Sequence, residues 1–149
     1  SEAFRRREAL ACVVFAPEAD GAAEGEASDE EIQRVAERVG QVFRQAGRAS
    51  DAIGRLGATE FAVIAPATGS TGAERLVERL GDSIESSTVP VRGGDRRVKI
   101  RAGYCAVPDF SDSPIDAVVS LLRATTVLRD LRKNGDQRRV RAFDAASTN

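Results

Sequence analysis

Short runs of hydrophobic residues alternate along the chain with stretches in which hydrophobic residues recur at helical spacing. The first run, residues 9–16, is apolar throughout. Such a run is typical of a strand that is buried on both faces of its sheet. Arginines at residues 5–7 precede it, as in a signal peptide, but eight apolar residues are short for that role and far fewer than the roughly 20 that cross a bilayer. We therefore expect a core strand here.

The best-defined helical pattern lies between residues 28 and 47. It begins with Ser28-x-x-Glu31, a capping box in which the hydroxyl and the carboxylate each bind a backbone N–H that has no helical partner. Gly47 marks its end. Residues 18–27, which precede the helix, are rich in Ala, Gly and Glu and predict a surface loop. The residues expected to face the core are Ile32, Val35, Ala36, Val39, Val42 and Phe43.

The remaining strands are predicted as two hairpins and one last strand. The first hairpin joins residues 52–56 and 61–65 through a turn at Gly57. The second joins residues 89–92 and 97–107 through a glycine-rich turn. Residues 140–143 supply the last strand.

Two further helices separate these strands. One is expected to begin at a Thr71-x-x-Glu74 capping box, and the other at Ser113-Pro114 and to end near Gly135. The order of strands and helices predicts an α+β fold of ferredoxin-like kind, in which helices cover an antiparallel-rich sheet. We expect one domain, residues 1–149, taken from a larger protein because the chain lacks an initiator Met.

Composition excludes several kinds of chemistry. The chain has 22 basic and 23 acidic residues, a net charge of −1, so it lacks the basic surplus expected of a nucleic-acid-binding surface. It has no histidine, which excludes Ser-His and Cys-His catalysis and histidine-ligated zinc. We expect no contact of this domain with nucleic acid or with a membrane.

Two cysteines, Cys12 and Cys105, each lie within an apolar stretch. This setting is typical of small core residues in a reducing, cytoplasmic compartment. A single disulfide between them is the alternative that the sequence leaves open.

Residues 48–66 resemble the signature hairpin of GGDEF domains, the diguanylate cyclase family, which joins two GTP molecules into cyclic di-GMP. Flanking segments agree with the same family, and the resemblance covers roughly residues 9–144. It implies a nucleotidyl cyclase-like fold and an origin in a bacterial signalling protein. The flanking segments are residues 34–38, 73–80, 98–107 and 132–135.

The signature itself is degenerate. The family pattern Gly-Gly-Asp/Glu-Glu-Phe corresponds here to Gly57-Ala58-Thr59-Glu60-Phe61. Ala58 replaces the glycine that lets backbone approach the nucleotide, and Thr59 replaces an acid that binds metal. The family also has a metal-binding Asp on its first strand, whereas residues 12–17 contain no carboxylate. Phosphoryl transfer with two divalent cations requires anionic oxygen ligands. The resemblance therefore implies an inactive domain without metal or cofactor.

Three charged residues fall at positions that contact the substrate in the family. Asp29 matches an Asp that contacts guanine, although an acid beside a helix N-terminus is also stabilising in its own right. Arg132 stands where the family has a phosphate-contacting Lys. Asp136 stands where an Arg is common, and we expect its charge to repel a triphosphate. Binding of GTP thus stays open.

A second set of charged residues matches the inhibitory site at which the product docks in many members. It comprises Arg48-x-x-Asp51, six positions before Gly57, and Arg79 on the second helix. Arginine presents a planar fork to phosphate and to guanine, and Asp accepts from guanine N1–H and N2–H. The resemblance implies that cyclic di-GMP docks here as an intercalated dimer and can bridge two domains. The alternative is that these residues are solvated surface charges.

The sequence therefore predicts a cyclic di-GMP receptor and regulatory dimerisation module that partners a second copy or a neighbouring domain. Two alternatives remain open. One is a residual Mg²⁺-dependent diguanylate cyclase that uses another acid, such as Glu18. The other is a structural signalling scaffold that binds no nucleotide.

Overall fold

The computed structural model describes residues 8–19, 28–48, 51–86, 88–91, 94–112 and 115–144. In these residues three α-helices and a short 3-10 helix accompany a six-stranded sheet. The elements are β1 (Leu10–Ala19), α2 (Asp29–Ala46), β2 (Ala52–Arg55), β3 (Phe61–Pro66), α3 (Ser70–Glu85), β4 (Thr88–Val91), β5 (Gly94–Val107), η1 (Phe110–Asp112), α4 (Ala117–Lys133) and β6 (Val140–Ala142).

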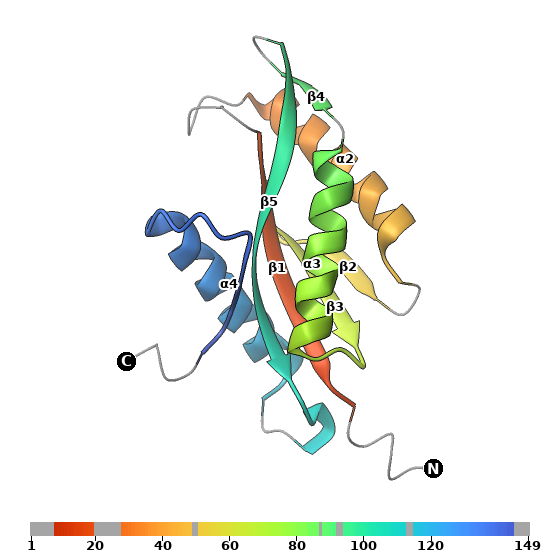
Figure 1. Cartoon of the computed structure of the whole chain (residues 1–149), viewed down its shortest axis with the longest axis vertical. Coiled ribbons are helices and arrows are strands. Elements are labelled where there is room, and N and C mark those ends of the chain that lie inside the picture. Colours follow the sequence, from red (N-terminus) through yellow and green to blue (C-terminus); the bar gives the residue numbers. More distant parts are fainter. Residues whose placement is uncertain are drawn as a thin grey trace.

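The strands lie in the order β2-β3-β1-β5-β4, and β6 pairs with β5 outside this path. All neighbours are antiparallel except β5 and β6, which are parallel. The long strands β1 and β5 occupy the centre of the molecule (Figure 1). The predicted α+β fold with an antiparallel-rich sheet is confirmed.

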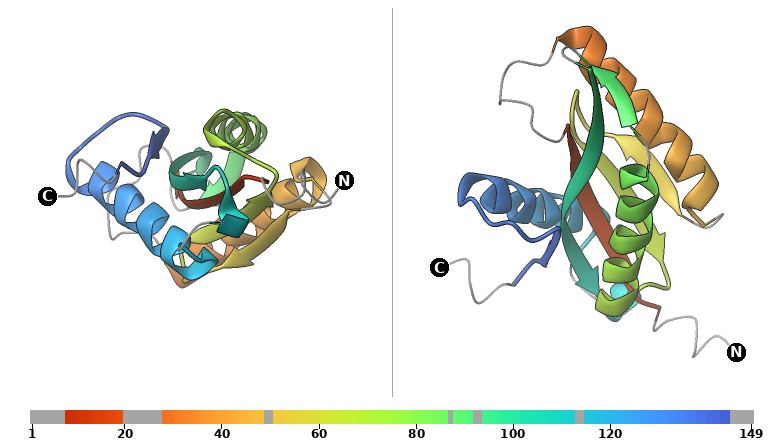
Figure 2. Two further views of the ribbon diagram at one scale, coloured as in Figure 1. Left: turned by 90° about the horizontal axis from the view of Figure 1, so that it is seen from below. Right: turned by 45° about the horizontal axis from the view of Figure 1, so that its top comes forward.

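Helices cover both faces of this sheet. Helices α2 and α3 lie on one side of the β1–β5 pair and α4 on the other (Figures 1 and 2). Side chains of β1 alternate between the two layers, because successive residues of a strand point to opposite faces. Val13 and Phe15 join the core under α2 and α3, whereas Val14 and Ala16 join the core under α4. The prediction that this run is buried on both faces is confirmed.

The first predicted helix is also confirmed. Ser28 is the N-cap of α2, and its hydroxyl oxygen accepts a hydrogen bond from Glu31 N at 3.2 Å. The helix ends at Ala46, with Gly47 as its C-cap. All six residues predicted to face the core are at least half-buried.

The predicted capping box at Thr71 is wrong. Helix α3 starts one residue earlier, at Ser70, and no described side chain caps its N-cap residue, Gly69. The Glu74 carboxylate instead accepts a hydrogen bond of 2.5 Å from the Tyr104 hydroxyl of β5. A buried hydroxyl needs a partner, and a carboxylate is the strongest one within reach. The Glu74 carboxylate, which the local pattern assigned to the helix cap, therefore binds Tyr104.

The N-cap of helix α4 is not the predicted residue. The predicted cap, Ser113-Pro114, lies outside the described residues. The N-cap in the structure is Asp116, whose carboxylate accepts from Val119 N at 2.8 Å. The helix ends at Lys133, just before Gly135, which has a φ of +66° that suits glycine.

Two strands extend beyond their predicted bounds. Strand β1 runs to Ala19, two residues into the predicted loop, and residues 20–27 of that loop lie outside the described residues. Strand β5 begins at Gly94 and not at residue 97, because Val91 pairs directly with Gly94 across the hairpin. Each extension pairs with a neighbouring strand: Ala19 of β1 lies opposite Val98 of β5, and Gly94 of β5 lies opposite Val91 of β4.

Both cysteines are buried, free and opposite each other on β1 and β5, as expected of small core residues. Burial, and then proximity to Cys105, raises the pKa of Cys12 from 9.0 to about 11. Among the described residues, no helix is long and apolar enough to cross a membrane.

The close contact between α4 and β5 predicts that Gly103→Ala destabilises the domain. A Cβ at Gly103 would lie 2.7 Å from Leu128 N and would also overlap the Ala124 carbonyl oxygen. Backbone atoms cannot rotate away, so we expect a loss of about 3 kcal/mol in the free energy of unfolding, measured by urea denaturation. Gly54→Ala on β2 is the control, because nothing lies within 4 Å of its added Cβ. Equal stability of the two variants would contradict this packing.

The environment of Cys12 predicts low thiol reactivity. The thiolate is the reactive form, and a raised pKa keeps Cys12 protonated in the fold until the pH approaches about 11. The stabilisation from this neutral thiol is present below the unfolded pKa of 9.0 and is lost as pH rises through the folded value. We expect Cys105→Ala, which retains only Cys12, to react much more slowly with Ellman's reagent at pH 8 when folded than in guanidinium. Rapid labelling of the folded variant would show that α4 opens readily.

Candidate functional site

Residues 57–61, which align with the signature, contain the tight connection between β2 and β3. Leu56 N and Gly57 N both donate to the Glu60 carbonyl oxygen, at 2.8 and 3.3 Å. Arg55 closes the turn from outside: its Nε donates to Gly57 O at 2.9 Å and its Nη2 to Ala58 O at 2.7 Å. The predicted hairpin with Gly57 in the turn is confirmed.

Phe61, the last residue of the signature, anchors the hairpin in the core. Its ring stacks on Phe15 of β1 with 5.5 Å between the ring centres. Gly57, Ala58 and Thr59 are all exposed. The chain thus retains the backbone frame of the signature and presents a neutral Thr59 hydroxyl on it.

Two carboxylates near this hairpin are bound by arginines of α4. Glu60 lies 3.8 Å from Nη2 of Arg129, and Glu18, at the end of β1, lies 3.2 Å from Nε of Arg132. The structure therefore pairs Arg132, predicted as a phosphate contact, with Glu18, the acid that the residual-cyclase alternative requires. Both arginines are partly exposed, so each pair contributes little to stability.

This donor set does not fit a divalent cation. Magnesium requires several hard oxygen ligands in octahedral geometry, usually including carboxylates. Here Glu18 and Glu60 each face a guanidinium, and Thr59 adds only an exposed neutral hydroxyl. Within the described ranges, no group of three or more His, Cys, Asp or Glu side chains is arranged to hold a metal ion.

Asp29 lies at the start of α2, exposed, in a first turn that also contains Glu30 and Glu31. Three acids in that turn stabilise the helix through its dipole. This explains Asp29 without a nucleotide and leaves its side chain accessible to one.

Asp136 is held by a neighbour. Arg138 donates to it through Nη2 at 2.7 Å and through its backbone N at 2.9 Å, and these bonds lower the pKa of Asp136 to about 2. The carboxylate is thus ionised at neutral pH, and the Arg138 guanidinium offsets its charge. The expected repulsion of a triphosphate is weaker than the sequence alone suggests.

The predicted Arg48–Asp51 pair forms a compact unit after α2. Arg48 Nη2 lies 3.1 Å from Asp51 Oδ1, and Arg48 N donates to Asp51 Oδ2 at 3.2 Å. The Asp51 side chain is 0% exposed, whereas the Arg48 side chain is 46% exposed. The guanidinium therefore faces solvent, and the carboxylate behind it is covered.

The third predicted residue of this set, Arg79, reaches the same place from α3. Its Nε donates to the carbonyl oxygen of Ala46 at 3.1 Å, two residues before Arg48. The structure thus gathers Arg48, Asp51 and Arg79 at the C-terminal end of α2. The degenerate signature lies at the far end of β2, whose four residues span about 13 Å.

Sequence reasoning missed one member of this cluster, Thr68. It is 4% exposed, and its Oγ1 accepts a 2.6 Å hydrogen bond from Arg48 Nη2. The only sequence signal was a polar residue just after Pro66, where a strand ends and a helix is about to begin.

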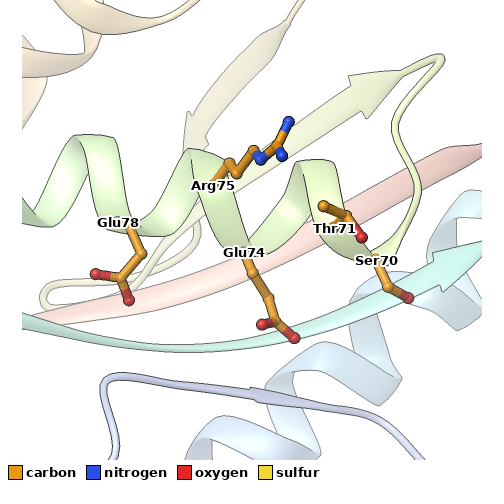
Figure 3. Close-up of a pocket in the computed structure, with 5 residues that line it drawn as sticks. All are labelled: Ser70, Thr71, Glu74, Arg75 and Glu78. Carbon is orange, nitrogen blue, oxygen red and sulfur yellow. The ribbon is translucent and has the colours of Figure 1, made fainter.

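The hollow on α3 is separate from both sets. It has a volume of about 370 Å³ and is lined by Ser70, Thr71, Glu74, Arg75 and Glu78 (Figure 3). Its acids are already engaged, Glu74 by Tyr104 at 2.5 Å and Glu78 by Arg139 at 2.7 Å. Burial and the Glu74 contact raise the pKa of Tyr104 to about 12, so that hydroxyl stays protonated.

Comparison with known proteins gives a family match over most of the chain. The family model described as "Diguanylate cyclase, GGDEF domain" matches residues 25–138. No curated protein matches the chain.

Solved structures share the fold at low sequence identity. The GGDEF domain of DgcB from Caulobacter crescentus, in complex with c-di-GMP, is 17% identical with a TM-score of 0.69, covering 95% of this chain and 82% of that one. A GGDEF-only variant of PA1120 from Pseudomonas aeruginosa is 24% identical with a TM-score of 0.65, covering 96% and 81%. The active GGEEF domain of a diguanylate cyclase from Vibrio cholerae is 19% identical with a TM-score of 0.64, covering 96% and 88%.

Proposed function

The chain belongs to the GGDEF family of diguanylate cyclase domains, and from this premise we propose that it binds cyclic di-GMP without synthesising it. It acts as a receptor and regulatory dimerisation module within a signalling protein. The ligand docks at Arg48, Asp51 and Arg79, and the degenerate hairpin makes no product.

One contrast carries this proposal. The acids that remain near the hairpin, Glu18 and Glu60, are paired with arginines. The side chain of Arg48, by comparison, is 46% exposed. A site for divalent metal ions needs carboxylates that are free to bind them, which this hairpin lacks. A site for an anionic nucleotide needs accessible arginine, which the end of α2 supplies.

Arg48 is the principal contact in this proposal. The bonds that its guanidinium makes to described residues all use Nη2, so Nε and Nη1 point their donors elsewhere. Each of these groups can donate to a phosphate oxygen, or to N7 or O6 of guanine. Arg79 adds a second cation nearby.

Asp51 has two roles available to it. In the structure it holds Arg48 from behind, with its carboxylate covered. Contact with guanine N1–H and N2–H requires the carboxylate to exchange the N–H groups of Arg48 for those of the base. Asp51 therefore contributes either directly or by positioning Arg48, and its replacement weakens binding in both cases.

Dimerisation follows from the ligand. An intercalated pair of cyclic di-GMP molecules presents phosphates and guanines on two sides, so two domains can be bridged. The DgcB domain was solved in complex with c-di-GMP, which agrees with a ligand of this type on this fold.

We expect cyclic di-GMP to bind with a Kd in the micromolar range or tighter in isothermal titration calorimetry. Arg48→Ala and Arg79→Ala should each weaken binding by about tenfold, the loss of roughly 1.4 kcal/mol that one charge-assisted contact supplies. Arg75→Ala, on the same helix one turn earlier, is the matched control and should bind as the unmodified chain does. No binding at tens of micromolar, or unchanged binding by Arg48→Ala, would favour the nucleotide-independent scaffold.

We also expect no cyclic di-GMP from GTP in the presence of Mg²⁺ or Mn²⁺, because no described carboxylate is left unpaired at the hairpin to hold the metal. Chromatography of the nucleotides after overnight incubation, with an active diguanylate cyclase as the positive control, measures this. Product that disappears in Glu60→Gln or Glu18→Gln would establish the residual cyclase instead.

A further inference from the structure

Thr68 is a buried polar residue whose hydroxyl and backbone N–H are both engaged. Its Oγ1 accepts from Arg48 Nη2 at 2.6 Å and donates to the Pro66 carbonyl oxygen at 2.8 Å. Its backbone N donates to the Ala9 carbonyl oxygen at 3.3 Å. Burying a hydroxyl is costly unless it is satisfied, and here the satisfaction includes a charge-assisted bond to Arg48.

The backbone and the packing around Thr68 fix it in this position. The preceding residue, Ala67, has a φ of +51°, a left-handed conformation that costs about 1 kcal/mol for a residue other than glycine. On the other side, a Cβ on Gly72 would lie only 2.9 Å from the Thr68 methyl group. Thr68 is therefore flanked by Ala67, which has a strained backbone, and by Gly72, whose lack of a side chain leaves room for the Thr68 methyl group. Such strain persists only where the surrounding structure requires it.

The acceptors around the Arg48 guanidinium all contact one of its nitrogens. Nη2 donates to Asp51 Oδ1, to the Pro66 carbonyl oxygen and to Thr68 Oγ1, at 3.1, 3.3 and 2.6 Å. The shortest of these is the bond to Thr68. A guanidinium held at Nη2 by three acceptors has lost most of its rotamer freedom before any ligand arrives, so the N–H groups of Nε and Nη1 keep fixed directions.

We propose that Thr68 is a positioning residue that holds Arg48 through Nη2 and leaves the N–H groups of Nε and Nη1 for an anionic nucleotide. This inference rests on the proposed binding of cyclic di-GMP at Arg48. Thr68 does not itself contact the ligand. It lowers the entropy cost of binding by keeping the guanidinium in the bound orientation.

The bond from Thr68 N to Ala9 gives this arrangement a second consequence. Ala9 directly precedes β1, so the residue that orients Arg48 is also attached to the start of the central strand. Thr68 is therefore held by its side-chain bonds to Arg48 and Pro66 and by its backbone bond at Ala9.

Thr68→Val tests the proposal, because valine keeps the shape and removes the hydroxyl. We expect its affinity for cyclic di-GMP to fall about tenfold in calorimetry at a temperature where the variant is fully folded by circular dichroism. Thr68→Ser restores the hydroxyl and should bind within about twofold of the unmodified chain. A residue with a merely structural role would lower the melting temperature in Thr68→Val and leave the affinity unchanged, and that result would overturn the proposal.

A double-mutant cycle without ligand separates this inference from the proposed function. Unfolding of Thr68→Val, Arg48→Ala and the double variant in urea should give a coupling of at least about threefold in the unfolding equilibrium constant. Additive effects would overturn the Thr68–Arg48 link even if cyclic di-GMP binds. Coupling in a chain that binds no cyclic di-GMP would support the link and reject the proposed ligand.

Discussion

The burial of β1 on both faces is the constraint on which the remaining structure depends. The strand pairs with β3 on one side and β5 on the other, and its side chains fill two cores at once. Helix α4 approaches β5 so closely that Gly103 has no room for a side chain. Because interiors of this kind are close-packed, the ends of β1, β3 and α4 are held in fixed relation to one another. The two candidate sites form where these ends meet the surface.

At the hairpin end, this fixed relation brings arginines to carboxylates. Helix α4 places Arg129 and Arg132 beside Glu60 and Glu18. Exposed pairs of this type add little stability. Their effect is on which groups the carboxylates can bind. A carboxylate that neutralises an arginine is a poor ligand for a cation, since the metal must displace a charge of its own sign. The neutral Thr59 and the arginine pairs therefore act in the same direction, against a metal site.

At the other end of β2, the same scaffold produces a different electrostatic arrangement. Asp51, Pro66 and Thr68 supply acceptors for Nη2 of Arg48, and Arg79 donates to Ala46, the last residue of α2. The charges here are positioned by buried partners, in contrast to the largely exposed pairs at the hairpin. A pre-oriented guanidinium suits recognition of an anion, because little side-chain entropy remains to be lost on binding. The two ends of β2 thus differ in how their charges are held, by buried partners at Arg48 and by more exposed pairs at the hairpin.

The sequence by itself determined the fold class and the order of its elements, because hydrophobic spacing carries that information locally. Its resemblance to the family also pointed to Arg48, Asp51 and Arg79 as candidates. The sequence assigned Glu74 to a helix cap, because a local pattern cannot register the competing Tyr104 hydroxyl on a strand 30 residues away. Only the tertiary structure decided which partners the charges take: Glu18 with Arg132, Glu60 with Arg129, and Arg48 with buried Thr68. The physical reason is that hydrogen bonds and ion pairs depend on distances between segments, and those distances are set by packing around β1.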